Sequence, residues 1–158
     1  MLKRSFDLLS ATLLLLILFP VIFIVAILVR IFLGKPILFS QIRPGFQEKP
    51  FTVYKFRTMT DARNAQGELL PDSIRLTSFG LFLRHTSLDE LPQLFNVLLG
   101  HMSLVGPRPA LYNQYDLRQM RKDVGIHRIR PGVTGWAQVN GRDEITLQEK
   151  VHLDLVYL

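Results

Sequence analysis

The chain has 158 residues, enough for one domain with a modest core, and its 19 Lys and Arg against 13 Asp and Glu give a formal charge of +6. A positive balance favours an anionic partner, such as nucleic acid, an anionic lipid surface or a phosphorylated substrate. Because the sequence contains no cysteine, it excludes disulfide scaffolds and thiolate metal sites.

A long apolar segment lies near the start of the chain. Residues 8–29 carry no charge, and as a helix these 22 residues would be about 33 Å long, comparable to the ~30 Å hydrocarbon core of a bilayer. Lys3 and Arg4 imitate the start of a signal peptide, but the apolar run is longer than usual and no small-residue cleavage site follows it. The sequence therefore predicts a membrane segment over residues 1–33.

Pro20 lies in the middle of this segment, where it removes one hydrogen bond from a helix. A simple kinked span is one interpretation, because membrane helices tolerate proline. The other is a re-entrant membrane helix that enters, bends at Pro20 and returns. Positive residues prefer the cytoplasmic side, and they flank both ends, with Lys3 and Arg4 before the segment and Arg30 and Lys35 after it. The re-entrant form places both flanks on that side.

Residues 34–158 read as one further domain. Two short strands are predicted around a turn, at 37–42 and 51–56, and a polar loop follows at 60–73. Helical patterns then alternate with joints rich in Gly and Pro: helices at 78–86, 87–100 and 114–123, joints at 103–109 and 130–142, and an apolar helical pattern at 151–158. That last pattern has no stop signal, so the natural protein is expected to continue. We predict an α+β fold, a re-entrant membrane helix followed by a small, mainly helical domain with a short β-hairpin.

Ser87-Leu88-Asp89-Glu90 matches a capping box, with Ser87 as the N-cap and Glu90 at the third helical position. On the simplest interpretation, the two carboxylates complement the helix dipole. Pro92 limits how far upstream a regular helix can begin. Asp89 and Glu90 are therefore predicted to lie at a helix terminus.

Basic residues recur around this acidic pair, several of them beside glycine or proline in loops expected to be rigid; they are Lys55, Arg57, Arg84, Arg108, Arg130 and Arg142. Guanidinium groups bind phosphate oxygens through paired contacts. An acidic pair among fixed arginines suits a magnesium–diphosphate complex, since Mg²⁺ is bound by one or two carboxylates together with substrate phosphates. The four His residues have no metal-ligand spacing and are interpreted as incidental.

The sequence resembles the bacterial sugar transferases, or monotopic phosphoglycosyl transferases, over nearly its whole length. The motifs that carry the resemblance are KRSFDLL at 3–9, YKFRTM at 54–59, SFGLFLRHTSLDELPQLFNVL at 78–98, MSLVGPRP at 102–109, RPGVTGWAQVNGR at 130–142 and LDLVYL at 153–158. The resemblance implies transfer of a sugar-1-phosphate from a UDP-sugar to undecaprenyl phosphate, with release of UMP. It also implies a cytosolic catalytic domain on the cytoplasmic face of the bacterial inner membrane, and it favours the re-entrant helix.

The same resemblance implies roles for individual residues. Asp89 would be the nucleophile that forms a covalent phosphosugar intermediate, and Glu90, together with Asp89, would bind Mg²⁺. The positions that match the family's phosphate site are Lys55, Arg57, Arg84 and Arg108. The positions that would face the nucleotide-sugar are Arg130, Gln138, Asn140 and Arg142.

A rival interpretation is a non-catalytic, membrane-tethered basic module that binds nucleic acid or anionic lipid. It would explain the net charge and the apolar segment. It would not explain why Asp89 and Glu90 lie amid the basic motifs, nor why aromatic stacking residues are scarce beside them. The enzyme is therefore the favoured prediction, with no nucleic-acid partner.

Overall fold

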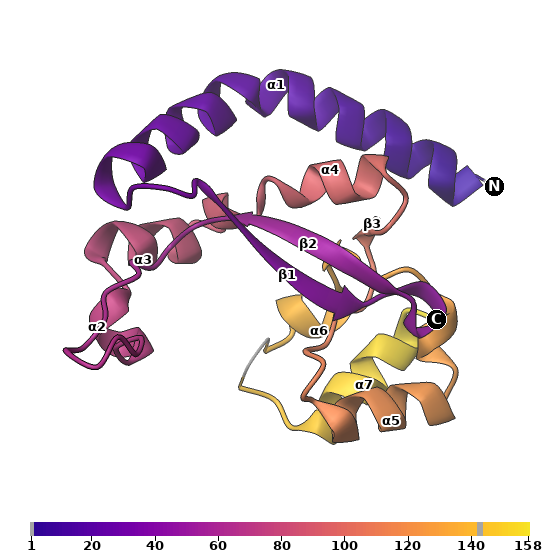
Figure 1. Ribbon diagram of the computed structural model, residues 1–158. Helices are drawn as coiled ribbons and strands as arrows, with labels where there is room; N and C mark the ends of the chain where they lie inside the picture. Colours follow the sequence, from indigo (N-terminus) through magenta and orange to yellow (C-terminus); the bar gives the residue numbers. More distant parts are fainter. Residues whose placement is uncertain (1, 142–143) are drawn as a thin grey trace. The chain divides into compact units, whose positions relative to one another are not determined.

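The structure is a computed structural model that describes residues 2–141 and 144–158 (Figure 1). It is a mixed fold of helices and two-stranded sheets. The elements, in chain order, are α1 (Leu2–Phe32), β1 (Leu38–Pro44), β2 (Pro50–Phe56), α2 (Asp72–Arg75), α3 (Ser78–His85), α4 (Gln93–Leu98), β3 (Ser103–Val105), α5 (Tyr115–Asp123), β4 (Gly132–Thr134), α6 (Trp136–Val139) and α7 (Leu147–Val156), with single 3₁₀ turns η1 (Phe46–Glu48), η2 (Leu88–Glu90) and η3 (Ile126–Arg128).

The chain forms two compact units, and it passes between them several times. The first unit consists of Met1–Leu15, Gln41–Val53 and Gln93–Leu158, and the second consists of Leu16–Ser40 and Tyr54–Pro92. Helix α1 and the β1–β2 hairpin each contribute residues to both units.

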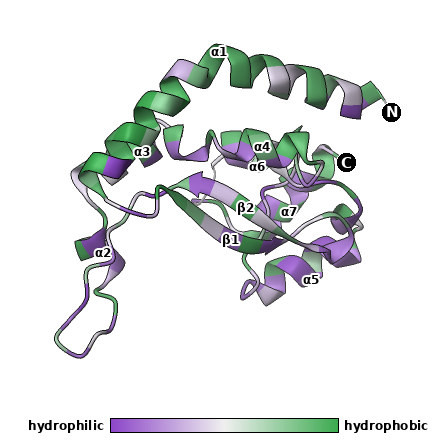
Figure 2. Cartoon of the chain, turned by 45° about the horizontal axis from the view of Figure 1, so that its top comes forward, coloured by the Kyte–Doolittle hydropathy of each residue, from purple (hydrophilic) through white to green (hydrophobic). Residues whose placement is uncertain are grey.

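Helix α1 is the predicted apolar segment. It contains 31 residues and continues through Pro20, and Figure 2 shows it hydrophobic along most of its length. It is long and apolar enough to cross a membrane: its most apolar stretch of 18 residues has a mean hydropathy of 3.2, and only 11% of that stretch is buried. The apolar helix is thus confirmed, whereas re-entrance at Pro20 and placement in a membrane stay predictions.

The core of the second unit forms on one face of α1. Val25, Val29 and Leu33 are spaced four residues apart, so they share a helix face, and they pack with Phe56 of β2 and Leu83 of α3. Helix α3 approaches the backbone very closely here. A Cβ at Gly80 would lie 1.8 Å from the Thr58 carbonyl oxygen, so only glycine fits at this position.

The first unit contains a sheet that the sequence analysis did not predict. Strand β3 pairs in parallel with β4, with Ser103 opposite Gly132 and Val105 opposite Thr134. A Cβ at Gly132 would lie 2.1 Å from the amide nitrogen of Gly106, so this glycine permits the close approach. The two Gly- and Pro-rich joints are therefore not only loops: each contains a three-residue strand.

The N-terminal turn of α1 is fixed to the first unit by polar contacts. The buried carboxylate of Asp7 accepts hydrogen bonds from Ser103 Oγ at 2.8 Å and from the Leu104 amide at 3.1 Å. Arg4 donates to two carbonyls at the C-terminal end of α4, at 2.6 and 3.0 Å, which is a common way to satisfy a helix end. Lys3 contacts Ser103 as well. These residues of the KRSFDLL motif thus attach α1 to the protein.

The predicted hairpin strands, the helices at 78–86 and 114–123, and the C-terminal helix are confirmed by β1, β2, α3, α5 and α7.

The predicted capping box at Ser87 is wrong. Ser87 adopts a left-handed conformation with φ 55°, and its side chain makes no capping hydrogen bond. The regular helix α4 begins only at Gln93, directly after Pro92, which is the limit that proline was expected to set. Helix α2, which begins within the predicted 60–73 loop, was also missed.

Candidate active site

Asp89 and Glu90 lie on the η2 turn, between the end of α3 and Pro92. The turn is short because the left-handed Ser87 closes α3 and Pro92 prevents a continuous helix through this region. Leu88 and Leu91, which flank the pair, pack against the core of the second unit. This packing holds both carboxylates in a buried position, with residues 7% and 8% exposed.

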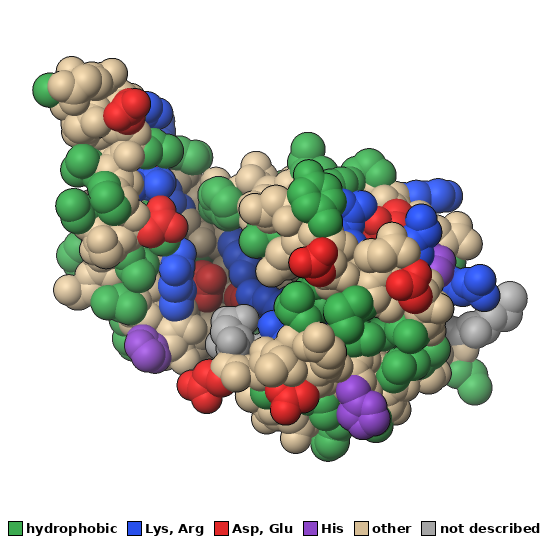
Figure 3. Space-filling model, turned by 90° about the horizontal axis from the view of Figure 1, so that it is seen from below, with side chains coloured by type: hydrophobic (Ala, Val, Ile, Leu, Met, Phe, Trp, Pro, Cys, Tyr) green, Lys and Arg blue, Asp and Glu red, His purple; other side chains and the backbone are tan. Residues whose placement is uncertain are grey.

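Two cations from neighbouring elements belong to the same cluster. Lys55 of β2 places its Nζ 2.8 Å from Glu90 Oε1, in a partly buried ion pair. Arg84 of α3 donates from Nε to the Thr58 hydroxyl at 3.1 Å, and its charge acts on Asp89. The second unit therefore brings together four of the predicted site residues. In the view of Figure 3, Lys and Arg side chains lie next to Asp and Glu side chains at several places on the surface.

The electrostatics of Asp89 are those of a buried carboxyl near mixed charges. Burial raises the pKa of Asp89 above its usual value, Lys55 and Arg84 oppose that rise, and the neighbouring Glu90 adds to it. A raised pKa means that the carboxylate is poorly solvated and correspondingly basic. Carboxyls whose pKa is shifted by burial and by specific charged neighbours are common at functional sites.

Arg57 is placed differently from the other predicted phosphate-binding residues. Its guanidinium is buried and donates to the carbonyls of Met59 at 2.6 Å and Lys35 at 2.5 Å. Its remaining nitrogen lies 2.7 Å from the carboxylate of Asp61. All three nitrogens thus contact protein oxygens, which favours a role in holding the segment after β2.

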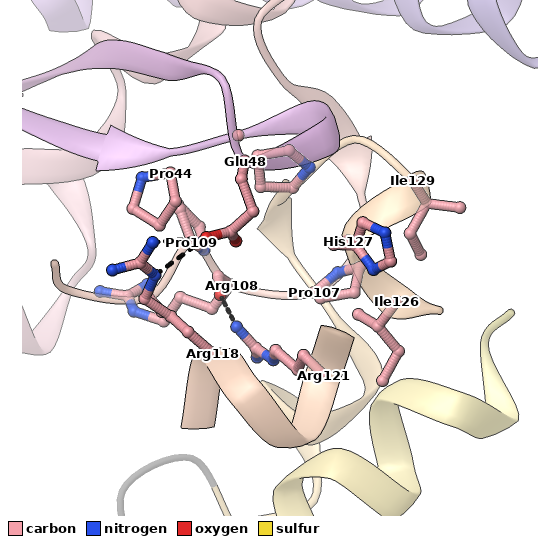
Figure 4. A pocket seen from close by; sticks show the side chains of 13 residues that line it. Pro44, Glu48, Pro107, Arg108, Pro109, Arg118, Arg121, Ile126, His127 and Ile129 are labelled. Atoms are coloured by element: carbon pink, nitrogen blue, oxygen red, sulfur yellow. Dashed lines mark hydrogen bonds and ion pairs between the residues drawn. The ribbon is translucent and has the colours of Figure 1, made fainter. Parts of the chain in front are cut away.

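Arg108 belongs to the first unit, where it lines a cavity of about 40 Å³ (Figure 4). Its carbonyl accepts a hydrogen bond from Arg121 at 2.8 Å, and Arg118 forms an ion pair with Glu48 at the same cavity. A second cavity, of about 180 Å³, is lined by Arg108 together with Gln138. The structure therefore brings together one predicted phosphate ligand and one predicted nucleotide-sugar ligand.

The other predicted nucleotide-sugar residues also lie in the first unit. Arg130 donates to the Gly100 carbonyl at 2.8 Å and lies over the ring of Phe46. Asn140 donates to the Trp136 carbonyl at 2.9 Å. Arg142 lies outside the described residues.

Sequence reasoning missed Arg43 and Lys150, which line the 180 Å³ cavity with Arg108. A signal for Arg43 was present, because its Arg-Pro-Gly sequence repeats that of the 130–132 joint. No comparable sequence motif surrounds Lys150, which lies on helix α7 near the end of the chain.

A metal ion could be held by Asp89 and Glu90. Within the residues that the structure describes, no cluster of three or more His, Asp or Glu forms a larger set of ligands. Two carboxylates fit Mg²⁺, which binds proteins through one or two carboxylates and takes its other oxygens from substrate phosphates and water.

The chain matches the family described as bacterial sugar transferase over residues 1–158. It is 50% identical over 157 residues to the "Uncharacterized sugar transferase EpsL" of Bacillus subtilis (strain 168), covering 99% of this chain and 77% of that protein. It is 43% identical over 167 residues to the "UDP-glucose:undecaprenyl-phosphate glucose-1-phosphate transferase" of Escherichia coli (strain K12), covering 100% of this chain and 36% of that protein.

A third relative is the "UDP-N-acetylgalactosamine-undecaprenyl-phosphate N-acetylgalactosaminephosphotransferase" of Aeromonas hydrophila, 37% identical over 142 residues. That alignment covers 87% of this chain and 33% of the relative. The chain therefore spans about three quarters of EpsL but only about a third of the two named undecaprenyl-phosphate transferases. The match over all its residues shows that the chain belongs to the bacterial sugar transferase family.

Proposed function

We propose that this chain transfers a sugar-1-phosphate from a UDP-sugar to undecaprenyl phosphate and releases UMP. The names of its relatives support this general reaction. The observation that carries the proposal is the buried Asp89–Glu90 pair with Lys55 and Arg84 beside it. Buried carboxylates among cations suit a reaction in which negative phosphate oxygens must be held near a nucleophile.

The proposed reaction has two displacements at the same phosphorus atom. A carboxylate oxygen of Asp89 attacks the sugar-bearing phosphorus, the bridging P–O bond of the diphosphate breaks, and UMP leaves with the bonding electrons. An oxygen of the lipid phosphate then attacks that phosphorus and releases the Asp89 carboxylate. Carboxylate nucleophiles of this kind split one difficult step into two.

The cations would hold the phosphate oxygens during both displacements. Lys55 of β2 forms an ion pair with Glu90, and the positive charge of Arg84 on α3 interacts with the Asp89 carboxylate. Arg108 of the GPRP motif is proposed as a further phosphate ligand. Bound Mg²⁺, held by Asp89 and Glu90, would supply positive charge that offsets the charge on the transferred phosphoryl group.

We place the protein in the bacterial inner membrane through a re-entrant α1, with the catalytic residues on the cytoplasmic face. Two features support this topology. Basic residues flank both ends of the apolar segment. In addition, Asp7 and Ala11 near the start of α1 are buried in the first unit, while Val25 and Val29 near its end are buried in the second.

The proposal is tested by UMP release from a panel of UDP-sugars, with undecaprenyl phosphate and Mg²⁺. Asp89→Asn should lower the rate by about 10⁴-fold or more, because an amide cannot form the acyl phosphate. Wild-type protein given the productive UDP-sugar without acceptor should become labelled with phosphosugar. The matched control is Asp72→Asn, which changes an exposed carboxylate of the same unit and should leave the rate unchanged.

Robust UMP release by the Asp89→Asn variant would show that the covalent route is wrong. The alternative function, a basic module that binds nucleic acid or anionic lipid, makes the opposite forecast. It predicts no UMP from any donor and salt-sensitive association with nucleic acid.

A further inference from the structure

The loop at residues 106–109 carries Arg108 between two prolines, Pro107 and Pro109. Each proline ring fixes one backbone angle and removes an amide hydrogen, so the loop has few internal hydrogen bonds to hold it. Its first proline is held from outside: the Pro107 carbonyl accepts a hydrogen bond from the Gly132 amide of β4 at 2.9 Å. The loop is thus attached to β4 on one side of Arg108.

The next two carbonyls of the loop are held by guanidinium groups from two other elements. Nη1 of Arg121 on α5 donates to the Arg108 carbonyl at 2.8 Å, as Figure 4 shows. Nη1 of Arg43 on β1 donates to the Pro109 carbonyl at 3.2 Å. Three consecutive carbonyls therefore accept hydrogen bonds from three separate elements of the first unit.

The two arginines use their nitrogens in the same way. Nε and Nη2 of Arg121 both donate to one carboxylate oxygen of Asp154. Nε and Nη2 of Arg43 both donate to the amide oxygen of Gln41, at 3.1 and 2.7 Å. A planar guanidinium held at two nitrogens has a fixed orientation, so its third nitrogen donates at a defined place. All three nitrogens of each group contact protein oxygens, which suits a group that holds the loop.

Both arginines act where Arg108 meets a cavity. Arg43, Arg108 and Arg121 together line the cavity of about 180 Å³. A guanidinium binds phosphate oxygens well only when its planar group lies in the right orientation. If the loop moved freely, part of the binding free energy would be lost in ordering it. A loop that is fixed in advance would bind phosphate more tightly without any additional contact to the ligand.

We propose that Arg43 and Arg121 are positioning residues, which hold the backbone of residues 107–109 so that Arg108 is preorganised for a substrate phosphate. The inference rests on the proposed function, because it concerns the phosphate ligand of that reaction. Neither positioning residue needs to contact the substrate, since each acts through the orientation of Arg108.

The test is a double-mutant cycle on the affinity for UDP, measured by isothermal titration calorimetry with the protein in lipid nanodiscs and Mg²⁺ present. Arg108→Met should weaken UDP binding by about tenfold or more, because a charge-assisted contact to phosphate is lost. Arg43→Met should weaken it by about three- to tenfold in the wild-type background. In the Arg108→Met background the same change should cost less than about twofold, because no guanidinium is left to orient.

Two outcomes of this cycle would overturn the proposal. Losses that multiply in the double variant would mean that Arg43 acts independently of Arg108, and an unchanged affinity in Arg43→Met would mean that its contact is not needed. The matched control is Lys122→Met, which removes one positive charge from an exposed position on α5 and should change the affinity by less than about twofold. An equal loss in the control would show that net charge alone is responsible.

Arg121 requires a variant that keeps the fold. Arg121→Met alone would leave Asp154 buried without its counter-charge, so it is combined with Asp154→Leu. The combined variant should unfold cooperatively and still bind UDP about three- to tenfold more weakly than wild type, because the Arg108 carbonyl has lost its donor. Unchanged affinity would show that the pair only holds α5 and α7 together. If this variant fails to fold, the Arg43 cycle still decides the proposal.

UDP binding requires neither an acceptor nor turnover, so failure of this inference can be distinguished from failure of the proposed function. The cycle can succeed when no UMP is released from any donor, which would contradict the proposed function alone. It can also fail when UMP release is normal, which would contradict the positioning role alone. Absence of UDP binding by the wild-type protein would overturn the positioning role, whatever the transfer assay shows.

Discussion

Two buried clusters of opposite charges, one in each unit, are built in different ways. In the first unit, Arg121 of α5 directs both Nε and Nη2 to one oxygen of Asp154 on α7, at 2.9 and 2.5 Å, and Nη1 to the Arg108 carbonyl. Asp154 is only 1% exposed. In the second unit, Lys55 Nζ lies 2.8 Å from Glu90 Oε1, and burial raises the pKa of the neighbouring Asp89, as it also raises the pKa of Asp154.

The difference in geometry distinguishes an ion pair that holds two helices together from the candidate active site. At Asp154, a planar guanidinium provides parallel donors in a fixed geometry, so the charges neutralise each other and hold two helices together. At Asp89 and Glu90, the neighbouring cations are the flexible ammonium group of Lys55 and the guanidinium of Arg84, an exposed residue. Ion pairing alone therefore does not distinguish the two clusters, whereas the geometry in which each charge is satisfied does.

The largest effect on stability is expected at the closed pair. Asp154→Leu leaves Arg121 buried without its counter-charge and should lower the free energy of unfolding by about 3–5 kcal/mol, measured by chemical denaturation in detergent micelles. The double variant Arg121→Met with Asp154→Leu should recover most of the loss, because it removes both charges. Asp123→Asn, on the exposed face of α5, serves as the control. If the double variant is no more stable than the single one, the pair is not what the helices depend on.

A smaller effect on stability is expected at Arg57 than at Asp154. Arg57 and Arg84 were both predicted to bind phosphate, but their replacement should affect stability differently. Arg57→Met leaves carbonyls and Asp61 without a donor and should cost about 1–3 kcal/mol of stability. Arg84→Met, at an exposed position, should change stability by no more than about 0.5 kcal/mol and yet abolish most UMP release. Thermal unfolding measures the stability of both variants, and transfer assays measure their UMP release. Equal losses of stability would remove the distinction between scaffold and site.

The smallest effect concerns helix capping. Thr146 forms a capping box with Glu149 at the start of α7, so Thr146→Ala should cost about 1 kcal/mol. Ser87→Ala removes no capping bond and should change stability less. The bonds from Thr146 lower the pKa of Glu149, so their contribution is present above the ordinary pKa of Glu and is lost as the pH falls through the lowered value. A pH-independent difference between wild type and Thr146→Ala would contradict this.

Local patterns predicted the elements that are long or strongly alternating. The hairpin strands and helices α3 and α5 follow from hydrophobic period and turn residues. Strands β3 and β4 could not be predicted in this way, because each has three residues and their pairing joins segments about thirty residues apart. The Ser87 capping box was wrong because Ser87 adopts a left-handed conformation after α3, which the four-residue pattern does not indicate.

The sequence also placed the centre of the candidate site. Asp89, Glu90, Lys55 and Arg84 do belong to one cluster in the second unit. The contacts of Arg57 could not be foreseen from its motif, since its carbonyl partner at Lys35 is set by tertiary packing. Composition likewise gave no sign of a cavity of about 420 Å³ in the second unit, whose lining includes Leu38, Arg57 and Leu69, because its wall combines residues from five separate stretches of chain.

The pattern of burial along α1 bears on how much of this helix a bilayer could cover. Between Ala11 and Val25 no residue of α1 is buried, and this interval, residues 12–24, contains 13 residues. At ~1.5 Å per residue it is about 20 Å long, roughly two thirds of a ~30 Å hydrocarbon core. A straight crossing would draw Asp7 and its partners towards lipid or thin the membrane locally. The proposed re-entrant insertion, with its bend at Pro20, would require neither, and it would let the protein occupy one leaflet only.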